Sequence, residues 1–172
     1  MFRLLAVSVS ALLITCCNVP HRIIKDPVRL EAVQKVAVLP FNCSEKETGY
    51  VISEALAAGL LRSRFVVLER SQIDRLLQEQ GFSVGDYAEG YAVAVGHLKG
   101  VDAVIVGTAT IDRETCSSPP WVIECTARMV DLVSGEIIMA TSFTPGMRKN
   151  KDLPAAYGTE VGEVLAAGFF VE

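Results

Sequence analysis

The stretch that decides the fold is Lys35-Val36-Ala37-Val38-Leu39-Pro40-Phe41, a short aliphatic run stopped by a proline. Such a run is typical of a strand that is buried on both faces. The residues from Gly49 to Arg62 then show a helical period. Apolar side chains recur there at four-residue steps, with small residues beside them that are expected to let the helix approach a sheet closely: Ile52, Leu56, Leu60, Ala55 and Gly59. A second buried strand is predicted over Phe65–Leu68.

The downstream chain continues with the same kinds of element. Helices are predicted over Ser71–Gly81, over Asp86–Lys99 and from Pro154 onward, each with a capping or stop residue at one end. Strands are predicted over Val101–Ile111, Trp121–Val133 and Glu136–Phe143, the last two joined by a tight turn at Val133-Ser134-Gly135. The expected fold class is α/β: a single domain with a mixed, helix-covered β-sheet in the order β-α-β-α-α-β-β-β-α.

The first seventeen residues have the layout of a secretory signal. One charge, Arg3, precedes an apolar run from Leu4 to Cys17, and polar residues follow. A membrane-spanning helix needs about 20 apolar residues, which is longer than this run. An export signal over residues 1–15 is therefore preferred to a retained transmembrane anchor.

The end of this run resembles a bacterial lipobox, in which a cysteine is acylated and becomes the first residue of the mature chain. Leu13 lies three residues before Cys16, as that pattern requires, so Cys16 is the predicted lipid acceptor and Cys17 the alternative. Residues 16–33 are expected to be a lipidated tether and residues 34–172 the folded domain. Because Asn18 stands where an aspartate would retain such a protein in the inner membrane, the outer membrane is the expected location, with the domain facing the periplasm.

Charge and cysteine content narrow the function classes. The formal net charge is -4 and no basic stripe is present, which argues against a nucleic-acid partner. Cys116 and Cys125 flank a turn-rich segment at 117–120, and the residues fit a disulfide and two unpaired thiols equally well. Since the five cysteines form no Cys-x-x-Cys motif and no cluster with histidine, no metal and no cofactor are expected.

No catalytic constellation is found in the sequence. His97 has no acidic residue or cysteine motif near it in the sequence that would indicate catalysis. Ser71 is explained by its position as the N-cap of a predicted helix. Asp131, beside the hairpin turn, is expected to hydrogen-bond the turn backbone. Trp121, after two prolines, is a candidate partner contact, although it is equally expected to fold back on the sheet.

Five pieces of the chain, in this order and spacing, resemble the CsgG family of bacterial lipoproteins. They lie at 36–41, 66–70, 73–81, 100–107 and 130–137. The resemblance covers roughly Lys35 to Phe143. It implies a periplasmic α/β domain on a lipid anchor, without catalysis; related small lipoproteins activate penicillin-binding proteins or support flagellar structures. The segment between Asp112 and Trp121 is too short for the membrane hairpins of the curli channel, each strand of which needs about 9–11 residues.

The sequence therefore predicts a lipid-anchored, periplasm-facing protein of the bacterial envelope that binds another envelope protein and is not an enzyme. The alternative is a ring-forming subunit of an outer-membrane export or appendage complex, in which the domain would form a homo-oligomer.

Overall fold

The aliphatic run at Lys35 forms a central strand of the domain in the computed structural model, which describes residues 20–68, 100–112, 121–144 and 154–170. This strand, β2 (Lys35–Val38), pairs in parallel with β4 (Val66–Leu68) on one side and with β5 (Ala103–Asp112) on the other. Val36 and Ala37 are fully buried, as expected for a strand covered on both faces.

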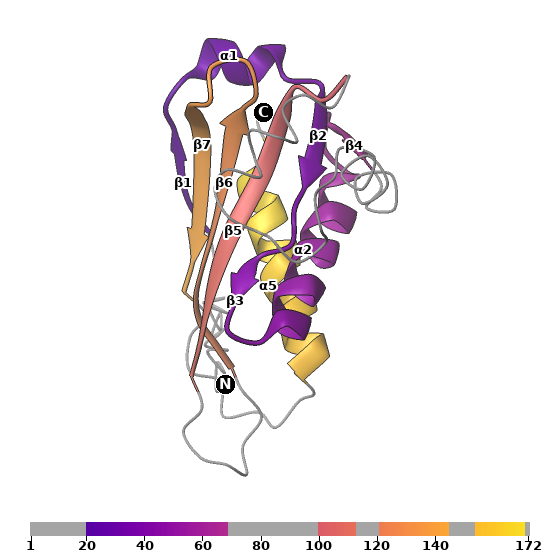
Figure 1. The fold of residues 1–172 in the computed structure, drawn as a ribbon, viewed down its shortest axis with the longest axis vertical. Coiled ribbons are helices and arrows are strands. Elements are labelled where there is room, and N and C mark those ends of the chain that lie inside the picture. The colour runs from indigo at the N-terminus through magenta and orange to yellow at the C-terminus, as the bar shows by residue number, and fades with distance from the viewer. Residues whose placement is uncertain (1–19, 69–99, 113–120, 145–153, 171–172) are drawn as a thin grey trace, which may run out of the picture.

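The sheet has seven strands in the order β1-β7-β6-β5-β2-β4, with β3 (Asn42–Cys43) paired to β5 beside the end of β2 (Figure 1). Three antiparallel pairings join β5 to β6 (Trp121–Asp131), β6 to β7 (Ile137–Phe143), and β7 to β1 (His21–Ile24). The sheet is therefore mixed, parallel around β2 and antiparallel from β5 to β1.

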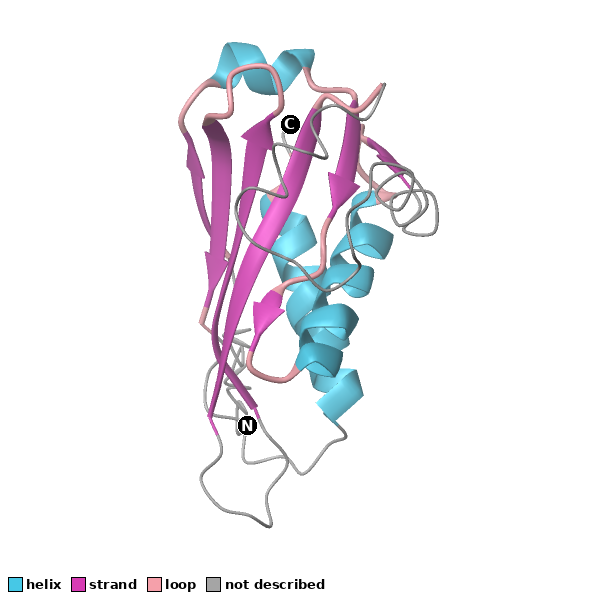
Figure 2. Cartoon of the chain, viewed as in Figure 1, coloured by secondary structure: helices cyan, strands magenta, loops and turns pink. Residues whose placement is uncertain are grey.

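Two long helices, α2 (Lys46–Leu60) and α5 (Pro154–Gly168), pack side by side against one face of the sheet, and the short α1 (Pro27–Ala32) lies across one end (Figures 1 and 2). The main core lies between these helices and the sheet. Its fully buried members include Ile52, Leu56 and Leu60, the apolar stripe read from the sequence, together with Ile105 and Met129 of the sheet. A smaller apolar cluster, centred on Ala37 and Val104, lies on the other face.

The small residues of α2 serve a different purpose from the one predicted. A Cβ atom added to Gly59 would overlap with Ala166 of α5, and one added to Gly162 would overlap with Ala55 of α2. These residues therefore bring α2 close to α5, and the prediction that they bring α2 close to the sheet is wrong. The period of a helix shows which residues share a face but not which neighbour that face meets.

Residues 20–33, predicted to be part of a tether, belong to the folded domain. The strand β1 pairs along its whole length with β7, and α1 is capped at its N-terminus by Asp26, with Pro27 in the first turn. Leu30 and Val33 are buried in the main core. The prediction failed because an exposed four-residue edge strand and a six-residue helix with one buried side chain are too short to show a period.

The remaining described elements agree with their predictions. The turn at Val133-Ser134-Gly135 joins β6 and β7, with Gly135 at a φ of +71°, and α5 begins at Pro154. The predicted α/β class is confirmed, with β1, α1 and β3 as elements that the expected order lacked. The helices predicted over 71–81 and 86–99 lie outside the described residues.

Candidate functional site

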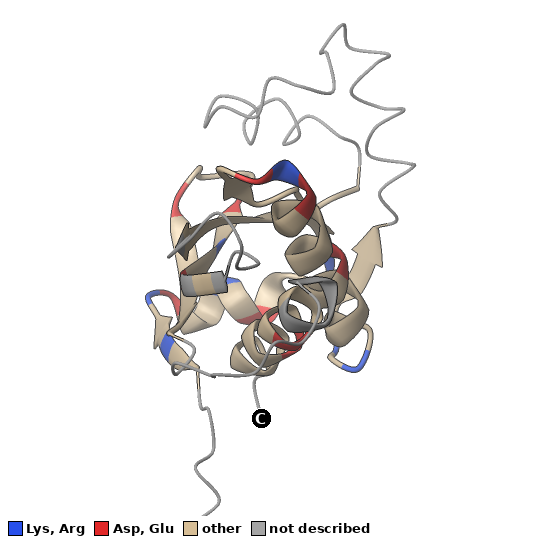
Figure 3. Cartoon of the chain, turned by 90° about the horizontal axis from the view of Figure 1, so that it is seen from below, with Lys and Arg blue, Asp and Glu red and all other residues tan. Residues whose placement is uncertain are grey.

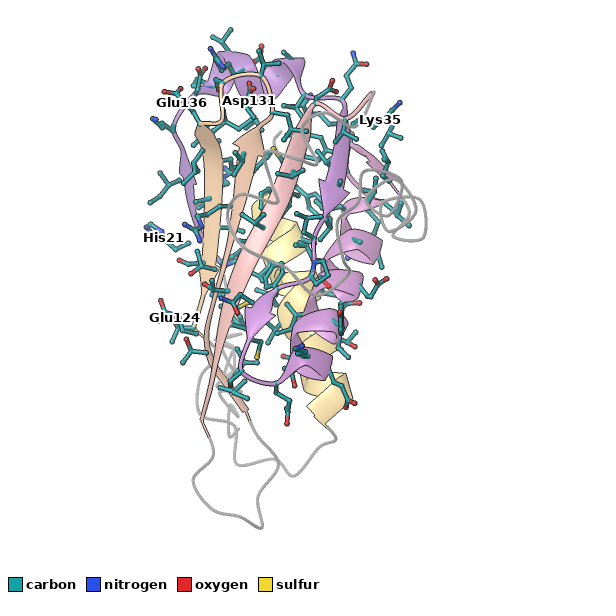
Figure 4. All side chains as sticks on the ribbon, in the orientation of Figure 1. His21, Lys35, Glu124, Asp131 and Glu136 are labelled. Carbon is teal, nitrogen blue, oxygen red and sulfur yellow. The ribbon has the colours of Figure 1, made fainter. Side chains whose placement is uncertain are left out.

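The end of the sheet that carries α1 and the β6–β7 turn is held by a set of long-range polar contacts. At its centre is Asp131, whose Oδ1 accepts hydrogen bonds from the backbone N–H groups of Val133 and Ser134 at 2.7 and 2.9 Å. The predicted role of Asp131 in holding the turn is confirmed. Its Oδ2 lies 3.3 Å from Nη1 of Arg29 in α1, so one carboxylate connects the turn to the helix. Figure 4 shows Asp131 at the end of the sheet next to α1.

The protonation of Asp131 follows from these contacts. Burial raises the pKa of its carboxyl, but the hydrogen bonds from Ser134 and Val133 and the nearby Arg29 guanidinium outweigh burial, so the pKa lies below its ordinary value of 3.8. Asp131 is therefore charged near neutral pH and acts as an acceptor only.

The C-terminal end of α1 is fixed by Arg64. Its guanidinium donates to the carbonyl oxygens of Glu31 and Val33 at 3.0 and 3.2 Å and also to that of Leu30, and it lies 4.8 Å from the ring centre of Phe65. A cation placed at the last carbonyls of a helix is favourable because it also meets the negative end of the helix dipole.

The connection from α1 to β2 is held by Asp102. Its Oδ2 accepts from the backbone N–H groups of Gln34 and Lys35 at 2.9 and 2.8 Å. Together with Asp26 at the N-terminus of α1, these contacts anchor α1 at both ends.

This clamped end, which we define as α1 together with residues 131–137, exposes apolar side chains. Val28 is 76% exposed, Val133 is 94% exposed and Ile137 is 38% exposed. Large apolar side chains on a backbone that is held in place offer contact area at little conformational cost to a partner. The clamped end is therefore a candidate protein-interaction surface.

Two thiols lie on the core side of the opposite half of the sheet. Cys43 of β3 pairs with Ala109 of β5, which pairs with Cys125 of β6, so the three residues form one row. Two strand spacings separate the Cα atoms of the two cysteines by roughly 10 Å, which is beyond the reach of a disulfide. Neither thiol is bonded to another described cysteine, and burial together with nearby Cys43 raises the pKa of Cys125 to about 12.

The other predicted site residues are placed only in part. Cys16, Cys17 and Cys116 lie outside the described residues, so lipidation and a Cys116–Cys125 disulfide stay predictions. Trp121 is the first residue of β6, opposite Asp112, and its side chain is outside the description. Sequence reasoning missed the roles of Arg29, Arg64 and Asp102, although Asp26-Pro27 is a recognisable helix start.

The described ranges hold neither a metal-ligand cluster nor a membrane-spanning helix. Within them, no group of three or more His, Cys, Asp or Glu side chains is placed to hold a metal ion, and no helix is both long and apolar enough to cross a bilayer. Basic and acidic side chains are interspersed along the ribbon as seen in Figure 3.

Similarity to solved structures extends over most of the domain. Lipoprotein GNA1162 from Neisseria meningitidis has a TM-score of 0.57 at 19% identity, covering 74% of this chain and 92% of that chain. The PelC dodecamer from Paraburkholderia phytofirmans gives 0.50 at 14% identity, covering 89% and 98%. The C-terminal domain of LpoB from Escherichia coli gives 0.51 at 16% identity, covering 66% and 83%. At these identities the likeness concerns the fold.

Comparison by sequence identifies the family. No curated protein matches the sequence. The family model for the curli production assembly/transport component CsgG matches residues 31–116, half of the chain. The chain thus belongs to the CsgG family, as the order of its sequence pieces predicted.

Proposed function

We propose that this protein is a lipid-anchored, periplasm-facing assembly factor of the bacterial envelope that recruits another envelope protein without catalysing a reaction. The observation that carries the proposal is the clamped end, where Val28 and Val133 are exposed on a backbone fixed by Arg29, Arg64 and Asp131. Membership of the CsgG family supports it.

The non-catalytic part of the proposal is supported by Asp131 and Cys125, the two groups among the described residues whose pKa values are shifted. Shifted pKa values often mark catalytic residues. Here Asp131 holds a turn, and Cys125 is a buried thiol whose pKa of about 12 keeps it protonated and unreactive. Both groups therefore have a structural explanation.

The anchoring part of the proposal rests on Cys16 as the acylated residue, after removal of residues 1–15, with Cys17 as the alternative. A neighbouring fold, GNA1162, is named a lipoprotein. Mass spectrometry of the mature N-terminus is expected to find a diacylglyceryl group on Cys16. Cys16→Ser is expected to release the protein from the membrane fraction, whereas a Cys16→Ser chain that stays anchored would move the acceptor to Cys17 or indicate a retained helix.

The recruitment part is tested by cross-linking in cells followed by identification of the captured envelope proteins. Val133→Asp replaces the most exposed of the three apolar side chains of the clamped end by a charge, and it is expected to lower the yield of the captured partner about tenfold, the size of a moderate hot spot. Leu61→Asp is the matched control, because Leu61 is 69% exposed just after α2 and is not part of the clamped end. Equal losses from both variants, or recovery of lipid-processing enzymes alone, would contradict the proposal.

A second candidate function is a ring-forming subunit of an outer-membrane export or appendage complex. It is favoured by one comparison, because the matching PelC structure is a dodecamer and the match spans 98% of that chain. Native mass spectrometry of the full chain extracted in mild detergent tests it. A closed multiple of the protomer mass supports the ring, and a monomer at all concentrations excludes it.

A further inference from the structure

The anchor proposed at Cys16 leaves very little chain between the lipid and the folded domain. The structure describes the chain from Pro20 onward, and β1 begins at His21, so only residues 17–19 connect the acylated cysteine to the domain. An extended chain spans at most about 3.5 Å per residue, so Pro20 lies within roughly 14 Å of Cys16. The 18-residue tether expected from the sequence would have reached about 60 Å.

The place where the chain enters the domain is fixed by contacts with the end of α5. Pro20 lies beside Gly168, and Nη1 of Arg22 donates to the carbonyl oxygen of Phe170 at 2.6 Å. The start of β1 therefore cannot swing away from the body of the domain, and the surface around it must lie close to the membrane.

The strand at this position is the edge of the described sheet, and its side chains suit a lipid surface. Arg22, Ile23 and Lys25, which we call the β1 strip, are all exposed, and Ile23 is 57% exposed. Residues 20–25 contain no acidic side chain. Because successive side chains of a strand point to opposite faces of the sheet, Arg22 and Ile23 lie on opposite sides of β1. A membrane surface that runs along the outer edge of β1 can be contacted by both side chains. Figure 4 shows His21 of β1 on this outer edge of the sheet. The acidic Glu124 belongs to β6, which is two strands away from β1 in the sheet order.

We infer that the β1 strip lies against the phospholipid head groups of the membrane that holds the anchor, with Ile23 in the interfacial region and the two cations at the phosphates. The inference rests on the proposed acylation of Cys16. An arginine guanidinium carries five N–H donors, and the bond to Phe170 uses one of them. Basic residues next to a membrane attract anionic lipids, and apolar side chains beside them enter the interface.

The test is photo-cross-linking of the full, acylated chain in vesicles of phosphatidylethanolamine and phosphatidylglycerol. Benzoylphenylalanine replaces Ile23 in one sample and Val66 in the other, and lipid adducts are quantified by mass spectrometry. Val66 is a matched control because it is 58% exposed and lies on β4, at the other end of the strand order, about 24 Å away at five strand spacings. We expect at least tenfold more lipid adduct at position 23, and equal yields would overturn the inference.

Two further variants, the second with a matched control, separate this contact from anchoring. A Gly/Ser spacer of about ten residues inserted before Pro20 is expected to leave the chain in the membrane fraction but to lower the adduct at position 23. Lys25→Gln is expected to lower it up to about fivefold, whereas Lys46→Gln, an exposed lysine on α2, leaves it unchanged.

The outcomes distinguish the two proposals. An acylated chain that sediments with the vesicles but gives no adduct at position 23 overturns the membrane contact alone. A chain that carries no acyl group and stays in the supernatant overturns the anchor and the contact together.

Discussion

Asp131 shows how a single carboxylate organises the clamped end. It receives two backbone N–H groups of the turn and one guanidinium of α1, so three donor groups from two pieces of chain meet at one side chain. An ionised acceptor makes stronger hydrogen bonds than a neutral one. The turn and the helix are thus coupled through one residue.

Removing that carboxylate is expected to loosen the clamped end. Asp131→Ala leaves the N–H groups of Val133 and Ser134 without their acceptor and should lower the free energy of unfolding by about 1–2 kcal/mol. Asp131→Asn keeps an acceptor for the turn and loses mainly the attraction to Arg29, so its loss should be about 0.5–1 kcal/mol. Urea unfolding measures both, and a larger loss for Asn than for Ala would contradict this account.

The same residue gives the domain a defined acid response. Its folded-state pKa lies below the ordinary value of 3.8, so its stabilising contribution is complete above pH 3.8 and is lost as the pH falls through the folded-state pKa. In Asp131→Ala, the difference in stability from the native sequence is therefore expected to shrink on acidification.

Thr141 is a buried residue whose hydroxyl finds no hydrogen-bond partner in the part of the chain that the structure describes. It is 1% exposed on β7, beside Gly168 of α5. Since a buried hydroxyl without a partner is costly, Thr141→Val is expected to raise the free energy of unfolding by about 1 kcal/mol. Thermal unfolding measures the gain. Thr126→Val, at a half-buried threonine of β6, is the control and should show no such gain. A lower free energy of unfolding in Thr141→Val would contradict this account and would indicate that the hydroxyl is hydrogen-bonded to a buried water.

Among the elements, the pairing of α2 with α5 depends on residues without large side chains. Backbone atoms and Cβ atoms meet at Gly59 with Ala166 and at Gly162 with Ala55. Such close contacts leave no room for an added methyl group. The two helices are therefore packed closely against each other on the same face of the sheet.

Gly162→Ala separates packing from helix propensity. Alanine favours a helix over glycine by about 1 kcal/mol, yet here its methyl group would overlap with Ala55 and with the backbone of α2. We expect a net loss of about 1–3 kcal/mol in the free energy of unfolding, typical of an overfilled interface. Glu163→Ala, at the exposed neighbouring position, should change it by less than about 0.5 kcal/mol, and a stabilised Gly162→Ala variant would contradict the close packing.

The elements that could be predicted from the sequence show a periodic pattern of apolar residues, and the elements that were missed do not. The strands β2, β5 and β6 and the helix α2 bury whole apolar faces, so their patterns are visible in the chain. In β1 only Ile24 is even partly buried, and α1 buries only Leu30. Their stability comes from pairing with β7 and from contacts with Arg64 and Asp131, which join residues far apart in the chain.

For the whole molecule, Cys125 is a probe of global unfolding. It is fully buried on the core side of β6, and its pKa of about 12 suppresses the reactive thiolate. Alkylation of Cys125 is therefore expected only after denaturation, while the partly exposed Cys43 reacts in the native protein. If Cys125 stays unmodified in denaturant without reductant, it forms a disulfide with Cys116, which is one of the two alternatives predicted from the sequence.

The same thiol sets an alkaline limit to stability. In the unfolded chain it ionises near its ordinary pKa of 9.0, but in the folded chain only near 12. Between these values the unfolded state loses a proton that the folded state keeps, so the free energy of unfolding falls as the pH rises above 9.0. Cys125→Ala is expected to remove that part of the pH dependence.

The sequence by itself determined the α/β class, the main strands and helices, the hairpin at Gly135 and the family, because each rests on local pattern and on the order of the pieces. Only the tertiary structure decided that residues 20–33 are part of the domain, which face of α2 meets α5, and that Arg29, Arg64 and Asp102 fix α1. The physical reason is that periodicity records burial along one element. Strand pairing at an edge and ion pairs between distant residues leave no period in the chain.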